Sequence, residues 1–345
     1  MKRSLFLALV VIFALVACAP KGPAELTVMT HDSFAVGQEV VQAFEQANNV
    51  KVTFLASGDA GAALNKAILS KEAPLADVFY GVDNTFLSRA LDTDIFEPYQ
   101  SPALANIPAR FQLDPDHRLL PVDYGDVCIN YDKNYFAEKE LPVPVTLEDL
   151  IKPEYIGLLV VENPATSSPG LAFLLATVAH FGDPGYLDFW ASLRDNGLVV
   201  VNDWETAYYN NFSASSGQGP QPMALSYGSS PPAEVIFAET PISDAPTASI
   251  VGPDTCFRQI EFVGILKGTQ QRALAEKFVD FMLGKQFQED MPLQMFVYPV
   301  NPDATLPEEF VKYAQIPEQP AQLDPAVIAT NRDKWIQAWT ETVLR

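Results

Sequence analysis

The sequence predicts an α/β protein with two lobes joined by a pair of long strands. Short apolar segments of β pattern alternate with helical segments, an order typical of a mostly parallel sheet covered by helices. Two longer alternating segments, near 121–131 and 255–266, interrupt that order. The length of 345 residues also favours two domains. We therefore expect the two long segments to cross between the lobes as a hinge.

The first lobe is predicted from a β-α-β-α-β order. Its segments show the period of strands or helices, with Val40, Val41 and Phe44 spaced as on one helix face. The strands are expected at 25–30, 50–57 and 76–81, and the helices within 31–49, 58–74 and 83–92.

The second lobe is predicted to begin with the long strand near 121–131. A helix is expected within 142–157, and Ser168 and Pro169 are expected as N-cap and first residue of another helix. The further elements are expected as helices at 184–196, 270–284 and 325–344 and strands at 198–201 and 222–227. The first lobe would comprise 26–122 and 262–298, the second 123–261 and 299–345, with hinges near 121–128 and 255–262.

The N-terminus has the pattern of an export signal. Lys2 and Arg3 precede an apolar run that is short for a membrane span, so 1–17 is predicted to be a signal peptide. Leu15-Val16-Ala17-Cys18 resembles a bacterial lipobox, which predicts a lipid on Cys18 and a tether over 18–25. Ordinary cleavage near Ala19 is the alternative.

The charge balance argues against a nucleic-acid partner. There are 22 Lys and Arg against 43 Asp and Glu, a formal net charge of −21. Binding of a phosphate backbone requires clustered basic side chains, and the sequence contains no basic stripe. Acidity is compatible with a soluble exported protein and mildly favours cationic ligands.

The three cysteines and three histidines leave little room for a metal site. With lipid on Cys18, Cys128 and Cys256 remain as an even pair in an oxidising compartment, where a disulfide is expected. Two separate buried thiols are the alternative. No zinc-binding spacing occurs, so neither a metal nor a cofactor is expected.

Catalytic motifs are missing from the sequence. It contains no G-x-S-x-G elbow, no phosphate-binding loop of the G-x-x-x-x-G-K type, and no G-x-G-x-x-G after a strand. Serines in 165–170 are typical of helix caps, and the histidines form no recognisable arrangement for a nucleophile. The chain is therefore predicted not to be an enzyme.

Binding is favoured by polar loops that follow predicted strands, at 30–34, 57–61, 163–170 and 226–232. Ligands of open α/β sheets lie beyond the carboxyl ends of strands, where backbone N–H groups at helix starts are free. Trp204 and Tyr227 have polar or small neighbours, unlike ordinary core aromatics. Rings of this kind can stack on flat heterocycles or on cations.

The chain resembles the periplasmic thiamine-binding proteins of ATP-driven importers, within the type II solute-binding superfamily. The matching stretches are LTVMTHDSF, ADVFYGVDN, PVDYGDVCINYDKN, TSSPGLAFLLAT, DWETAY, ALSYGSSPP, FVDFMLGKQFQ and MFVYPVN. The resemblance implies an exported, monomeric, two-lobed clamp that traps thiamine or its phosphate esters and delivers them to a membrane permease of an ABC transporter. With a lipid on Cys18, it would act at a membrane surface.

The resemblance also implies ligand-binding positions. The family uses residues matching Ser167, Trp204 and Tyr227, and backbone near Asp59, Ala60 and Gly61. It has tyrosine where this chain has His31 and tryptophan where it has Phe296, and both changes keep a flat ring. The remaining predicted ligand residues are Asp32, a candidate counter-charge like Asp59, and Tyr208.

Two other functions remain open from sequence. The adjacent Tyr208 and Tyr209 could bind ferric iron through their phenolate oxygens, as in an iron-binding member of the same superfamily. An exported hydrolase, such as a phosphatase or esterase, is the third possibility.

Overall fold

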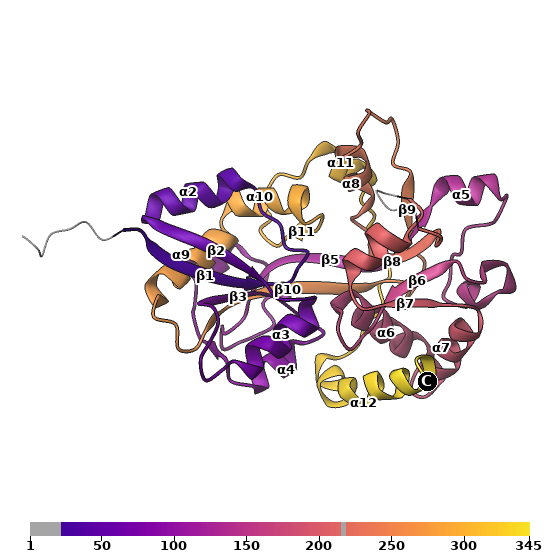
Figure 1. Cartoon of the computed structure of the whole chain (residues 1–345), viewed down its shortest axis with the longest axis horizontal. Helices are drawn as coiled ribbons and strands as arrows, with labels where there is room; N and C mark the ends of the chain where they lie inside the picture. The colour runs from indigo at the N-terminus through magenta and orange to yellow at the C-terminus, as the bar shows by residue number, and fades with distance from the viewer. Residues whose placement is uncertain (1–21, 215–218) are drawn as a thin grey trace, which may run out of the picture.

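The computed structural model of the chain describes residues 22–214 and 219–345. The predicted signal peptide over 1–17 and the predicted lipidation site Cys18 lie outside these residues. A mixed sheet runs through the molecule in the order β2-β1-β3-β10-β5-β8-β6-β7, with β4 on β10 and with β9 and β11 on β5 (Figure 1). The strands are β1 (Ala24–Thr30), β2 (Val50–Ala56), β3 (Val78–Asp83), β4 (Phe96–Glu97), β5 (Leu120–Asp132), β6 (Leu159–Glu162), β7 (Val199–Val201), β8 (Met223–Tyr227), β9 (Thr247–Ile250), β10 (Phe257–Leu266) and β11 (Tyr298–Pro299).

The long strands β5 and β10 join two groups of parallel strands, as predicted. β1 is parallel to β2 and β3 in one group, and β6 is parallel to β7 and β8 in the other. β10 is antiparallel to β3 and to β5, and β5 is antiparallel to β8. In Figure 1, β5 and β10 extend side by side from one lobe to the other. The two-lobed α/β fold with two crossover strands is therefore confirmed.

Helices flank both strand groups (Figure 1). The α-helices are α2 (Gln38–Asn48), α3 (Ala60–Leu69), α4 (Leu87–Asp92), α5 (Lys133–Glu138), α6 (Ser168–Phe181), α7 (Gly185–Asp195), α8 (Pro231–Ile236), α9 (Arg272–Leu283), α10 (Lys285–Gln294), α11 (Glu308–Tyr313) and α12 (Pro325–Val343). Short 3₁₀ segments are η2 (Pro102–Asn106), η3 (Ala109–Phe111), η4 (Glu148–Ile151) and η5 (Pro153–Tyr155), and η6 (Thr206–Asn211) is a π-helix.

Two local predictions were wrong in detail. The helix expected within 142–157 is replaced by η4 and η5, because Pro153 cannot continue a helix begun at Glu148. The N-cap of α6 is Ser167, and Ser168 is already helical. The Ser168 hydroxyl is bonded to Asp83 on β3, so it ties α6 to the other strand group.

The core is formed by apolar faces of the sheet and helices, with a small separate cluster around η6. That cluster contains Val160, Ala207, Tyr208, Phe212 and Ala224, with Trp204 packed against it. In the large core, α7 and α12 meet through an edge-on contact of Trp190 and Trp339, with ring centroids 5.4 Å apart.

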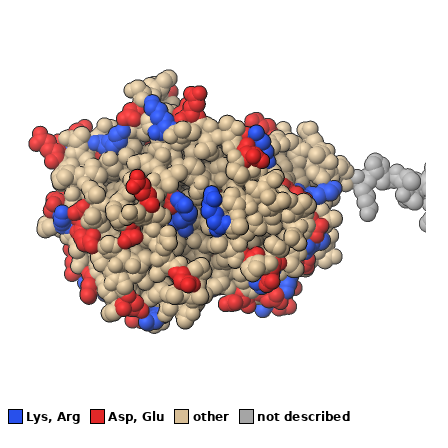
Figure 2. Space-filling view, turned by 180° about the vertical axis from the view of Figure 1, so that it is seen from behind, with Lys and Arg blue, Asp and Glu red and all other residues tan. Residues whose placement is uncertain are grey.

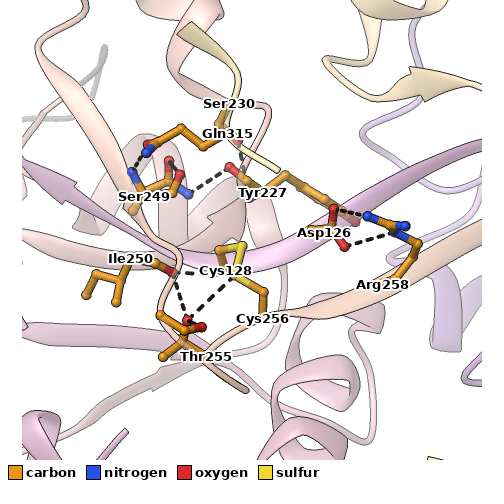
Figure 3. Close-up of a disulfide and its surroundings, with 12 residues drawn as sticks. Asp126, Cys128, Tyr227, Ser230, Ser249, Ile250, Thr255, Cys256, Arg258 and Gln315 are labelled. Atoms are coloured by element: carbon orange, nitrogen blue, oxygen red, sulfur yellow. Dashed lines mark hydrogen bonds and ion pairs between the residues drawn. A yellow bond between two sulfur atoms is a disulfide. The ribbon is translucent and has the colours of Figure 1, made fainter. Parts of the chain in front are cut away.

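A disulfide joins Cys128 on β5 to Cys256 just before β10, with an S–S distance of 2.09 Å. Both residues are fully buried. Next to it, Arg258 pairs with Asp126, with Nη2 2.8 Å from Oδ2 (Figure 3). The crossover strands are thus fixed to each other by a covalent bond and by an ion pair.

In the part of the chain that the structure describes, no helix is both long enough and apolar enough to cross a membrane. On the face drawn in Figure 2, Lys and Arg stand singly or in small groups among carboxylates.

Candidate functional site

A cavity of about 860 Å³ lies between the two strand groups. Its wall is built from the ends of strands, the starts of helices and the loop before β11. The sequence-predicted residues in this wall are His31, Asp59, Ala60, Trp204, Tyr208, Tyr227 and Phe296. Segments far apart in the chain therefore converge on one space, as expected for loops at the carboxyl ends of strands.

Three predicted residues do not line the cavity. Asp32 is exposed, and its Oδ1 accepts the backbone N–H of Gly58 at 2.8 Å. Gly61 instead allows α3 to approach the loop before α6, because a Cβ there would lie 3.0 Å from the carbonyl oxygen of Thr166. Ser167 is fully buried at the N-cap of α6; burial raises the pKa of Asp59, and Ser167 partly opposes that rise.

The start of α6 still contributes to the wall, through Ser168 and Pro169. Ser168 donates its hydroxyl hydrogen to Asp83, whose other oxygen accepts the N–H of Thr85 at 2.6 Å. Gln259 on β10 adds a hydrogen bond to Asp83 at 3.1 Å. This buried carboxylate therefore connects β3, β10 and the start of α6.

Trp204 and Tyr208 form a stacked pair at the cavity. Their ring centroids are 5.1 Å apart and their planes differ by 15°. The Trp204 indole N–H donates to Ser226 Oγ at 2.9 Å, and its backbone N–H lies 3.3 Å from Asp59 Oδ2. The Tyr208 hydroxyl donates to Glu234 at 2.8 Å. The π-helical turn η6, a kind of turn often found at functional sites, holds Tyr208 in this position.

His31 occupies the opposite side, against the backbone of β3. Gly81 has a φ of +105°, and a Cβ at this position would lie 2.5 Å from His31 Cδ2. Only glycine therefore leaves room for the imidazole. His31 Nε2 lies 3.4 Å from Glu261 Oε1. Burial lowers the pKa of His31, although Asp59, Asp123 and other nearby carboxylates act in the opposite direction.

The other rings come from β8 and from the loop after α10. The Tyr227 hydroxyl donates to Gln259 Oε1 at 2.8 Å, and burial raises the pKa of Tyr227. Phe296 has a φ of +53°, which is unusual for a bulky residue, and it meets Phe237 edge-on with centroids 5.5 Å apart. Since Phe237 is 67% exposed, this pair marks the outer edge of the cavity.

The cavity is acidic. Within the described chain, its lining contains no Lys or Arg, and its carboxylates are Asp59, Asp132, Glu234, Glu239 and Glu261. Burial raises the pKa of Asp59 and raises the pKa of Glu261 to about 7. A positively charged group entering here would be stabilised by these carboxylates.

Glu261, Asp83 and Phe237 were missed by sequence reasoning. Glu261 is a charged residue between Ile260 and the apolar second half of β10, and that contrast was the available signal. Asp83 ends the buried strand β3 in the same way. For Phe237 the sequence contains no comparable signal, because an apolar residue after a short helix is ordinary.

The alternative functions find less support in the geometry. Among the described residues there is no group of three or more His, Cys, Asp and Glu side chains that could hold a metal ion. The rings of Tyr208 and Tyr209 are nearly perpendicular, at 86°. His180 is engaged by Glu148 and Asp254 at 2.9 and 3.0 Å.

Comparisons with known proteins agree with a binding site. A family model described as bacterial extracellular solute-binding protein matches residues 73–331. The thiamine-binding periplasmic protein of Escherichia coli (strain K12) is 30% identical over 325 residues, which cover 93% of this chain and 94% of that protein. Its counterpart in Brucella suis is 29% identical over 342 residues and 97% of each chain.

A solved structure described as a periplasmic thiamin binding protein superposes with a TM-score of 0.82 at 30% identity, covering 95% of this chain and 100% of that chain. Fold, cavity and sequence similarity thus agree over nearly the full length of the chain. The chain belongs to the family of bacterial extracellular solute-binding proteins.

Proposed function

We propose that the protein binds thiamine in the cavity between its lobes and delivers it to the permease of an ABC importer. The observation that carries the proposal is an acidic, ring-lined cavity without Lys or Arg among its described lining residues. Thiamine is a flat, permanently charged cation, because its thiazolium nitrogen is quaternary. The named function of the similar Escherichia coli and Brucella proteins supports the same ligand.

The charge of the cavity favours thiamine over its phosphate esters. A phosphate adds negative charge, which Asp59 and Glu261 would repel and which no lining Lys or Arg would balance. The helix starts at Ala60 and Ser168 offer partial positive charge but no full positive charge. We therefore expect each added phosphate to weaken binding, although the monophosphate remains small enough for the cavity.

The aromatic side chains supply the apolar part of the binding energy. Trp204 stacked on Tyr208 presents a broad ring surface, and His31, Tyr227 and Phe296 stand elsewhere around the cavity. Flat cations bind favourably against such faces. The volume of about 860 Å³ lies in the usual range for small-molecule pockets.

Delivery requires opening and closing of the lobes. We propose lobes of 26–122 with 262–298 and of 123–261 with 299–345, bending where β5 and β10 cross. Contacts such as Ser168 to Asp83 and Trp204 to Asp59 form only when the lobes meet, so they would add to closure around the ligand. We further propose that the protein acts as a monomer without catalysis, anchored to the membrane by a lipid on Cys18.

Ferric iron is a weaker candidate. The phenol of Tyr208 donates to Glu234, and burial raises the pKa of Tyr208 well above its usual value. Both features disfavour the phenolate that iron requires. The aromatic side chains that line the cavity would also have no role in binding a bare ferric ion.

Isothermal titration with thiamine, thiamine monophosphate and thiamine diphosphate tests the proposal. The expected order of affinity is thiamine, then the monophosphate, then the diphosphate, all one to one. A ferric salt should leave the protein colourless, since iron–tyrosinate binding absorbs visible light. Failure of all three compounds to bind at high micromolar concentration would refute the function. Tightest binding of the diphosphate would refute the charge argument alone.

A further inference from the structure

Glu261 lies at the floor of the cavity on β10, with its carboxylate shared between two partners. Oε2 accepts a hydrogen bond from the Tyr80 hydroxyl at 3.1 Å, and Oε1 lies 3.4 Å from His31 Nε2. The residue is 8% exposed, yet it belongs to the cavity wall. It is thus a carboxylate that a ligand can reach but that bulk water scarcely solvates.

The same Tyr80 hydroxyl lies 2.6 Å from Asp123 Oδ2 on the neighbouring strand. A phenol has one hydrogen to donate, so it can serve only one of the two carboxylates at a time. Asp123 Oδ1 has no hydrogen-bond partner among the described residues. Asp123 and Glu261 are register partners on β5 and β10 and share the Tyr80 hydroxyl, and two buried carboxyl groups in this arrangement are stabilised when they hold one proton between them.

The groups around Glu261 do not supply a compensating positive charge. The ionisable residues that act on it from the packed elements are His31 after β1, Asp59 before α3, Tyr80 and Asp83 on β3, Asp123 on β5 and Tyr227 on β8.

Burial raises the pKa of Glu261 to about 7 and raises that of Asp123 well above its usual value, while it lowers the pKa of His31. The carboxyl pair therefore retains a proton more readily than exposed carboxyl groups do, and it lies beside an imidazole whose neutral form burial favours.

We propose that Glu261 is the counter-ion of the bound ligand and exchanges a proton for the ligand's positive charge. The proposal rests on thiamine as the ligand, because a fixed positive charge drives the exchange. The free protein holds the proton on the Asp123–Glu261 pair. On binding, that proton passes to water and buffer, the thiazolium charge takes its place, and no bond of the ligand is made or broken.

Proton exchange makes affinity depend on pH in a defined direction. Below the pKa of Glu261, binding releases about one proton, so affinity rises about tenfold for each pH unit. Above that pKa Glu261 is already ionised, and affinity becomes independent of pH. Glu261 would thus select a cation over a neutral molecule of the same shape, most strongly in mildly alkaline medium.

Titration calorimetry of thiamine in two buffers of different ionisation enthalpy, such as phosphate and MOPS, measures the released protons directly. We expect release close to one proton at about pH 6, about half at pH 7 and close to none above about pH 8.5. A neutral isostere, with thiophene in place of thiazolium, should bind without releasing a proton.

Glu261→Gln keeps the shape and an acceptor for Tyr80 but removes the charge. This variant should bind thiamine at least tenfold more weakly at pH 8, release no proton, and show a flat pH profile. Glu72→Gln is the matched control, since it removes an exposed carboxylate that does not line the cavity. It should retain the proton release of the unaltered protein.

The outcomes separate the inference from the proposed function. Thiamine binding without proton release, or the same release by Glu261→Gln, would overturn the role of Glu261 and leave the function intact. Proton release by the neutral isostere would overturn the charge exchange. Absence of thiamine binding at every pH would overturn both.

Discussion

Removal of the Cys128–Cys256 disulfide should destabilise mainly the second lobe. The cysteines are 128 residues apart, so the bond closes a loop that contains most of that lobe. The chain-entropy relation gives about 5 kcal/mol for a loop of this length. Relaxation and residual structure in the unfolded chain usually reduce such values, and we expect a loss of about 2–4 kcal/mol.

The replacement Cys128→Ala with Cys256→Ala avoids leaving an unpaired buried hydroxyl. At about 2–4 °C per kcal/mol for domains of this size, the melting temperature should fall by about 5–15 °C. Calorimetric melting measures this fall. The control is the unaltered protein unfolded in urea with dithiothreitol. It loses the disulfide but keeps both sulfur atoms, so it separates loss of the bond from loss of the side-chain atoms.

Hydrogen exchange then identifies the strands and helices in which stability is lost. Amides of β6, β8 and α6 should become less protected, whereas those of β1 and β2 should change little, because they lie outside the closed loop. An unchanged melting temperature would refute the loop-closure reasoning. Equal loss of protection in both lobes would show that the bond acts through the hinge instead.

Two further changes probe the binding ring and a surface histidine. Trp204→Ala should weaken thiamine binding by about 1–3 kcal/mol in titration calorimetry, since Tyr208 loses its stacked partner. Trp204→Phe should retain part of the affinity. A steep fall in melting temperature with unchanged affinity would assign Trp204 to the core alone. Burial lowers the pKa of His180, but hydrogen bonds to Glu148 and Asp254 outweigh it and raise that pKa overall. The added stability is therefore present below about pH 6.5 and lost as pH rises through the raised pKa of His180. His180→Gln should flatten this part of a profile of melting temperature against pH. A profile unchanged by the substitution would contradict the stabilising role of His180.

The long elements of the fold were predictable because periodicity accumulates over many residues. β5 and β10 span enough alternating positions to be distinguished from the short parallel strands. β4 and β11 have two residues each, so no pattern could reveal them. In 142–157, helical spacing was present but Pro153 limited it to 3₁₀ turns.

The rings and loops of the cavity were predictable for a different reason. Trp204 and Tyr227 have polar or small neighbours in sequence, which sets them apart from core aromatics. Asp123 and Glu261 are adjacent only because β5 and β10 pair in one register. The separation of the two residues in the sequence does not reveal that register. Sequence reasoning therefore found groups on loops and at strand ends, such as Trp204 and Tyr227, and missed the carboxyl pair inside the strands.

The distribution of tryptophans has a spectroscopic consequence. The chain has four, and Trp190, Trp335 and Trp339 are at most 3% exposed within the α7 and α12 region. Trp204 is the one whose indole borders the cavity. A change in intrinsic emission on ligand addition should therefore come from a single fluorophore, and Trp204→Phe should leave a constant background. The protein has in effect its own optical reporter of occupancy, which permits stopped-flow kinetics without a dye.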